Sequence, residues 1–175
     1  MNWSTYIDGL SSLFDKGGGT LWAILAASIM LWFLILERYW AYRWQLPELR
    51  ASLLREWHTS KRSVVHQMVP RRIRALVGEL QAEATRNFIT LHALTTILPL
   101  LGLLGTVSGM IKVFDVINLF GSGNTRGMAA GISEALVTTM AGLLTALSGV
   151  SFVTNLENRA ETLAREFETE LVEDK

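Results

Sequence analysis

Three uninterrupted apolar stretches constrain the fold of this chain more than any other feature of its sequence. They cover residues 20–36, 91–114 and 128–153. Each can cross a bilayer whose hydrocarbon core is about 30 Å thick, because a crossing helix needs roughly 20 residues. Half of the residues are hydrophobic, and they come in long blocks rather than in short amphipathic periods. The pattern predicts an all-α membrane protein with three transmembrane helices.

The first apolar stretch is expected to remain as an anchor rather than to be cleaved as a signal sequence. The residues before it are acidic and aromatic instead of basic, and no small-residue cleavage site follows it. Aromatic side chains, which settle at the depth of the lipid headgroups, mark both of its ends. These residues are Trp22 at one end and Tyr39, Trp40, Tyr42 and Trp44 at the other.

Basic residues gather between the first and second stretches and predict the orientation of the chain. They are Arg38, Arg43, Arg50, Arg55, Lys61, Arg62, Arg71, Arg72, Arg74 and Arg86. The segment before the first stretch has only Lys16, and the second hairpin has little beyond Lys112 and Arg126. Because Lys and Arg favour the cytoplasmic side, the N-terminus should lie outside and the C-terminus inside. The basic region could also bind anionic membrane lipids.

The segments outside the apolar stretches are also expected to be helical. Residues 3–14 place apolar side chains on one helical face, and the glycines within 16–19 provide a flexible corner. Residues 71–98 contain no Pro and one Gly, so we expect one continuous helix there. Beyond residue 153 the helical spacing continues. Its apolar positions are Leu156, Ala160, Leu163, Phe167 and Leu171.

The second stretch carries small residues on nearly one face, namely Thr95, Gly102, Thr106 and Gly109. Gly105 forms a G-x-x-x-G pair with Gly109, a spacing that lets two helix backbones approach closely in lipid. We therefore predict that the three glycines pack against another helix. A three-span monomer offers these faces no remaining partner, so spans two and three are expected to hold copies of the chain together.

The third stretch contains an acidic residue, Glu134, within an apolar run. An ionisable group inside a membrane span costs from about 2.5 kcal/mol upward, and it is generally kept where it meets a partner, a cavity or an ion path. Glu134 begins a row of residues that all lie within about 40° of one line along the helix. The line continues with Thr138, Ala141, Thr145, Ser148 and Phe152. Two alternatives are a solvated carboxylate near the outer interface and a purely structural hydrogen bond.

The sequence gives little support for catalysis or for the binding of a metal or cofactor. The chain has no Cys, and its three His residues lack metal-ligand spacing. There is no Ser/His/Asp grouping and no phosphate-binding loop. We therefore expect neither an enzyme nor a binder of a metal, an organic cofactor or nucleic acid.

Two segments resemble the paired signature of the ExbB/TolQ proton-channel family, the broader group that includes flagellar MotA. They are LLGLLGTVSGMIKVF at 100–114 and GISEALVTTMAGLLTAL at 131–147. The resemblance is closest to ExbB of the TonB energy-transduction system. It covers spans two and three closely and, through the three-span topology, the whole chain loosely.

The resemblance implies roles for particular residues. The family's essential carboxylate falls on Glu134, and its two pathway threonines fall on Thr106 and Thr139. Thr139 lies about 140° from Glu134 around the helix, so either it faces a different neighbouring helix or Thr138 takes part of its role. Thr138 and Thr145, from the line of hydroxyls, complete the predicted proton pathway.

The resemblance also implies partners and a location. We expect a homopentamer around a dimer of an ExbD-like single-span protein, with protons as coupling ion and a TonB-like protein energised in the bacterial inner membrane. A TolQ-type subunit of the Tol-Pal envelope system and a non-conducting scaffold are the alternatives. The expected segments are a periplasmic amphipathic helix 1–18, spans 19–37, 91–117 and 128–153, a cytoplasmic helical region 38–90, a periplasmic loop 118–127 and a cytoplasmic C-terminal helix 154–175.

Overall fold

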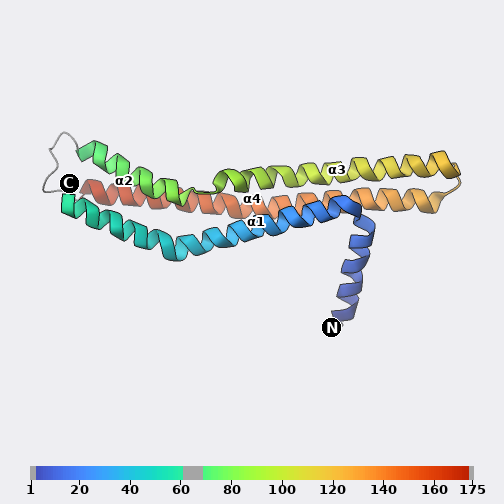
Figure 1. The fold of residues 1–175 in the computed structure, drawn as a ribbon, viewed down its shortest axis with the longest axis horizontal. Helices are drawn as coiled ribbons and strands as arrows, with labels where there is room; N and C mark the ends of the chain where they lie inside the picture. The colour runs from blue at the N-terminus through green and yellow to red at the C-terminus, as the bar shows by residue number, and fades with distance from the viewer. Residues whose placement is uncertain (1–2, 61–68, 174–175) are drawn as a thin grey trace. The chain divides into compact units, whose positions relative to one another are not determined.

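The described part of the chain is helical almost throughout. A computed structural model describes the backbone of residues 3–60 and 69–173, and the side chains of residues 17–59 and 69–173. It contains helices α1 (Trp3–Ser60), α2 (Val69–Ala84), α3 (Phe88–Phe120) and α4 (Thr125–Glu173) (Figure 1). Three helical segments are long and apolar enough to cross a membrane. The predicted all-α fold is therefore confirmed for the described residues, together with three helices capable of crossing a membrane.

The chain divides into two compact units. The first combines residues 1–32 with residues 92–150, and the second combines residues 33–91 with residues 151–175. Each of the helices α1, α3 and α4 contributes to both units. The two units differ in what they expose, and they are described separately.

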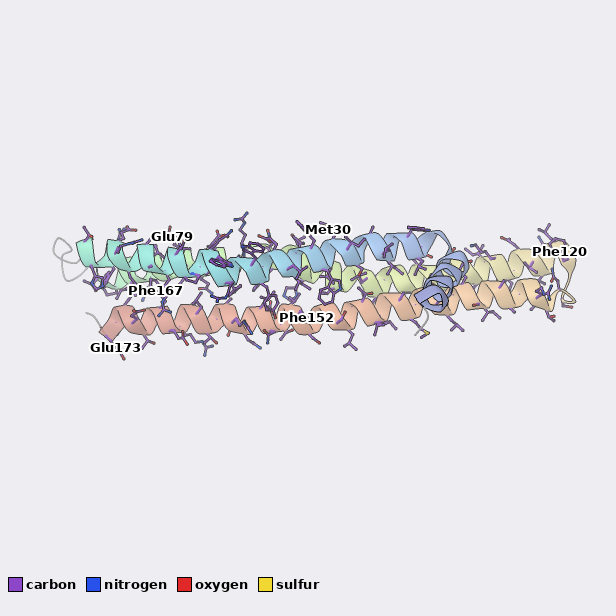
Figure 2. The ribbon with its side chains drawn as sticks, turned by 90° about the horizontal axis from the view of Figure 1, so that it is seen from below. Met30, Glu79, Phe120, Phe152, Phe167 and Glu173 are labelled. Atoms are coloured by element: carbon purple, nitrogen blue, oxygen red, sulfur yellow. The ribbon has the colours of Figure 1, made fainter. Side chains whose placement is uncertain are left out.

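The first unit exposes large apolar side chains. Met30 on α1 and Phe120 at the end of α3 are two of them (Figure 2). Others on the three helices are Trp22, Ile29, Leu100, Leu103, Leu104, Val107, Ile111, Phe114, Leu136, Met140, Leu144 and Leu147. An apolar exterior around an interior of small residues is the arrangement of helices that pack in lipid. This arrangement fits a multi-pass membrane protein, in line with the three described helices that are long and apolar enough to cross a membrane.

Helix α1 changes direction at Gly18. This residue has φ 60° and ψ −165°, outside the helical region, and the arm before it turns away from the rest of α1 (Figure 1). That combination of angles is essentially restricted to glycine. The corner expected within residues 16–19 thus lies at one residue. The apolar face predicted for residues 3–14 falls outside the described side chains.

The second unit has the core of an amphipathic helical bundle. Its α1, α2 and α4 segments bury apolar residues at intervals of mostly three and four, the spacing of helices that bury one stripe. On α4 the predicted positions Leu156, Ala160, Phe167 and Leu171 are buried, whereas Leu163 is only partly buried. The other buried residues include Leu46, Leu53, Trp57, Ile73, Leu76, Leu80 and Ala164.

The single helix predicted over residues 71–98 is wrong, because a turn at residues 85–87 separates α2 from α3. Asn87 there has φ 66°, a left-handed conformation that Asn tolerates better than most residues. Side chains of α1 satisfy the last carbonyls of α2. The Arg38 guanidinium donates to the Glu83 carbonyl, and the Tyr42 hydroxyl lies 3.0 Å from the Ala84 carbonyl oxygen.

The turn between α3 and α4 is shorter than the predicted loop of residues 118–127. It occupies residues 121–124, with Gly121 at φ 72°. Asn124 caps α4, since its Oδ1 accepts a hydrogen bond of 3.1 Å from the Gly127 N–H. This tight connection holds α3 and α4 side by side as an antiparallel pair (Figure 1).

Candidate functional site

The small-residue face of α3 packs against α4 of the same chain. A methyl group on Gly105 would overlap the Thr138 hydroxyl, and one on Gly109 would lie 2.7 Å from the Gly131 carbonyl oxygen. Gly102 faces the backbone of Thr139 in the same way. The premise that these faces lack a partner within the monomer is therefore wrong. Spans two and three cover each other's small faces.

Thr139 reaches across to α3. Its hydroxyl lies 2.9 Å from the Gly102 carbonyl oxygen and 3.1 Å from the Ala135 carbonyl oxygen of its own helix. Glu134 and Thr138 also meet α3, so Thr139 does not face a different helix neighbour. Thr138 and Thr139 both belong to the α3–α4 contact, and the division of the pathway role between them stays a prediction.

The other predicted pathway hydroxyls bond to carbonyls of their own helices. Thr138 is fully buried, and its hydroxyl lies 2.9 Å from the Glu134 backbone carbonyl oxygen. Thr145 donates to Ala141 over 2.8 Å, and Thr106 donates to Leu103 over 2.6 Å. Back-bonding of this kind satisfies a Thr hydroxyl inside an apolar helix.

Glu134 forms an ion pair with Lys112 of α3. The Lys112 Nζ lies 2.7 Å from each of the two carboxylate oxygens. The Glu134 side chain is only 10% exposed, whereas that of Lys112 is 51% exposed. The acidic group inside the third span is therefore a buried carboxylate whose counter-ion reaches it from the surface of the second span.

Lys112 was missed as a site residue, although the sequence carried a signal for it. Gly105, Gly109 and Lys112 follow one another at intervals of four and three, so they share one face of a helix. That face was already predicted to meet another helix. A cation at its end should have been paired with the acidic residue of the neighbouring span.

The backbone of α1 at the Gly18 corner forms the third side of the site. A methyl group on Gly18 would overlap Oε1 of Glu134, and it would lie 2.8 Å from the carboxyl carbon and 3.3 Å from the Lys112 Nζ. Backbone from α1 thus packs directly on the ion pair made by α3 and α4. The three membrane helices meet at one carboxylate.

These features set the chemistry open to the site. A carboxylate can bind and release a proton, and a lysine ammonium can neutralise the charge that the released proton leaves behind. Within residues 3–60 and 69–173 no group of three or more His, Cys, Asp or Glu residues could hold a metal ion. The fold and the site define a multi-pass membrane protein in which a buried carboxylate is paired with a half-exposed lysine.

Comparison with known proteins identifies the family. Residues 47–169 match the MotA/TolQ/ExbB proton channel family. The match covers more than half of the chain, and the chain belongs to that family. The resemblance expected from the two sequence segments is confirmed.

Several relatives carry ExbB names. The ExbB-like 1 protein of Synechocystis sp. is 45% identical over 69 residues, which cover 38% of this chain and 27% of that protein. The ExbB-like 3 protein of the same organism is 41% identical over 83 residues, or 45% of this chain and 40% of that protein. The biopolymer transport protein ExbB of Helicobacter pylori is 26% identical over 117 residues, or 67% of this chain and 81% of that protein. The chain thus spans less than half the length of the two Synechocystis relatives.

Proposed function

We propose that the chain is the channel subunit of an ExbB-type inner-membrane complex in which Glu134 takes up and releases protons. The observation that carries this proposal is the position of the carboxylate. It is nine-tenths buried, it lies among three membrane helices, and a half-exposed Lys112 is its counter-ion. An ionisable group in a membrane span is costly, and proton pathways are a common reason to keep one.

The proton motive force supplies the energy in this proposal. Moving one elementary charge through a potential of 100 mV is worth about 2.3 kcal/mol, which is comparable to the contacts between small helix faces. A protonated Glu134 has lost its charge and its attraction to Lys112, so the pair does not re-form while the proton is bound. The contact between α3 and α4 at this end is then weaker, and the helices can rearrange.

We propose the biological function of the complex from the names of the relatives. The Helicobacter pylori relative is called a biopolymer transport protein. We infer a pentamer of this chain around an ExbD-like dimer, which energises a TonB-like protein for outer-membrane transport. The basic residues between the first two spans favour the cytoplasmic side for that region. The N-terminal arm is then periplasmic.

A structural role for Glu134 is the second candidate. The ion pair with Lys112 joins α3 to α4, and a non-conducting scaffold would have the same contact. The two functions differ in whether the carboxylate must ionise. A TolQ-type role is a variant of the first function and would use the same proton site.

Proton uptake into liposomes separates the two functions. The chain would be reconstituted with an ExbD-like single-span protein, a potassium diffusion potential would be imposed, and an internal pH dye would be read. Wild type should acidify the lumen, and Glu134→Gln should not. Equal uptake by wild type and the Gln variant, above that of empty vesicles, would exclude a proton-carrying Glu134.

A further inference from the structure

The ion pair at Glu134 occupies both oxygen atoms on which a proton would bind. Each oxygen accepts a hydrogen bond of 2.7 Å from the Lys112 ammonium. Each oxygen has two lone pairs, and the ammonium takes one of them on both oxygens, so an arriving proton would have to bind next to a cation. Separating the two side chains removes that cation from the carboxylate.

The Lys112 side chain can move away from the ion pair, whereas the Glu134 side chain is enclosed. The lysine head is half exposed at the end of a flexible stem, while the glutamate side chain is nine-tenths buried. The corner of α1 lies against the carboxylate so closely that not even a methyl group fits at Gly18. With α1 behind it, the carboxylate stays directed at Lys112.

We propose that Lys112 is a positioning residue that keeps Glu134 closed to protons, and that the backbone of α1 at Gly18 holds the carboxylate in that closed position. The proposal rests on the proposed function, in which Glu134 carries the proton. It adds the step that must come first, which is opening of the Lys112–Glu134 pair. Lys112 lies within the signature segment 100–114, but the resemblance assigned no role to it, and Gly18 lies outside both signature segments.

Carbodiimide labelling tests this closed state without a partner protein or an ion gradient. Dicyclohexylcarbodiimide reacts with protonated carboxyl groups in apolar surroundings, and mass spectrometry locates the product. The full chain in lipid vesicles at neutral pH would be labelled as wild type, Lys112→Met and Lys112→Arg. The Met variant should modify Glu134 at least about tenfold faster than wild type, as expected from the loss of a hydrogen bond to a charged group. The Arg variant keeps a cation and should stay close to wild type.

Alanine substitution at Gly18, with the neighbouring Gly19 as the control position, provides a second test. Gly18→Ala should displace either the corner of α1 or the carboxylate, because φ 60° is strained for Ala and the methyl group would overlap Oε1 of Glu134. Either displacement removes the support behind the carboxylate and should speed the labelling of Glu134, although both charges remain. Gly19→Ala should label like wild type, because a methyl group there meets nothing within 4 Å. This pair also replaces the lysine comparison if Lys112→Met cannot be recovered, since it removes neither member of the ion pair.

The outcomes separate this proposal from the proposed function. If Lys112→Met or Gly18→Ala labels Glu134 at the wild-type rate, the closed state is rejected, even if proton uptake still depends on Glu134. If both variants label faster but Glu134→Gln vesicles take up protons normally, the proton-carrying role fails. In that case the Lys112–Glu134 pair is only a structural contact. The proposal that Lys112 keeps Glu134 closed to protons is then rejected as well.

Discussion

Thr139 on α4 and Gly102 on α3 are joined by a hydrogen bond of 2.9 Å between a side-chain hydroxyl and a backbone carbonyl. Such a bond requires the two helices to lie very close, and the missing side chain of Gly102 provides the space. The residue assigned to the proton pathway through the resemblance is thus also a link between spans two and three.

Thr139→Val keeps the shape of the side chain and removes this link. We expect it to destabilise the chain by about 0.6 kcal/mol, and by no more than about 1.7 kcal/mol, the range measured for hydrogen bonds between membrane helices. Unfolding in mixed detergent micelles would measure the change. Thr96→Val is the control, because the exposed Thr96 donates only to the His92 carbonyl of its own helix over 2.9 Å. An equal loss in both variants would contradict a special role for the link.

Gly105→Ala should disrupt the contact between α3 and α4. The added methyl group meets the buried Thr138 side chain, and overpacking of this kind costs about 1–3 kcal/mol. Gly78→Ala should instead leave stability unchanged or raise it by up to about 1 kcal/mol, because nothing lies within 4 Å of its methyl group and Ala favours a helix. Thermal unfolding of the monomer would compare them. Loss of the oligomer in Gly105→Ala with an unchanged monomer would show that this face contacts other copies instead.

Tyr42 makes the second unit sensitive to alkaline pH. Burial raises the pKa of Tyr42 from 10 to about 12, against a smaller opposite effect of Arg38 and Arg159. Because the folded state holds this proton more tightly, its stabilising effect is fully present below pH 10 and is lost as the pH rises to about 12. Tyr42→Phe cannot ionise at this position, so it should not lose stability from this ionisation. Unfolding midpoints between pH 8 and 12 would reveal it, and parallel curves for both proteins would argue against the raised pKa.

The absence of cysteine allows a direct test of orientation, since any introduced cysteine is the only thiol in the chain. Gly123 in the α3–α4 turn and Gly78 on α2 both have open space around them. In spheroplasts, a membrane-impermeant maleimide should label Gly123→Cys directly. Gly78→Cys should react only after permeabilisation. The reverse pattern would place the N-terminus in the cytoplasm.

The membrane spans and the helical faces could be predicted because they depend on local patterns. Apolar length indicated the spans, and intervals of three and four indicated the buried residues of α4, such as Leu156 and Phe167. The break at Asn87 could not be predicted in this way. It depends on Arg38 and Tyr42 of α1, distant in sequence, which satisfy the end of α2.

The site was predicted only in part. Glu134 stood out because a carboxylate is rare in an apolar run, but its partner Lys112 was read only as a sign of orientation. The glycines of the corner look alike in the sequence. A methyl group would meet Leu21 at Gly17, the carboxylate at Gly18 and nothing at Gly19. That difference depends on how α1 packs on the other spans, which no local pattern encodes.

Growth of cells that depend on siderophore uptake, with Glu134 replaced by Gln, Asp or Ala, tests the central claim most directly. Gln preserves size and hydrogen bonding but cannot ionise, so it should abolish growth while the oligomer is recovered at the wild-type level. Asp should retain some growth only if its shorter side chain still reaches its partner. If the carboxylate were structural, Gln would be tolerated and Ala would be worse. Growth of the Gln variant at the wild-type rate would contradict a proton-carrying Glu134.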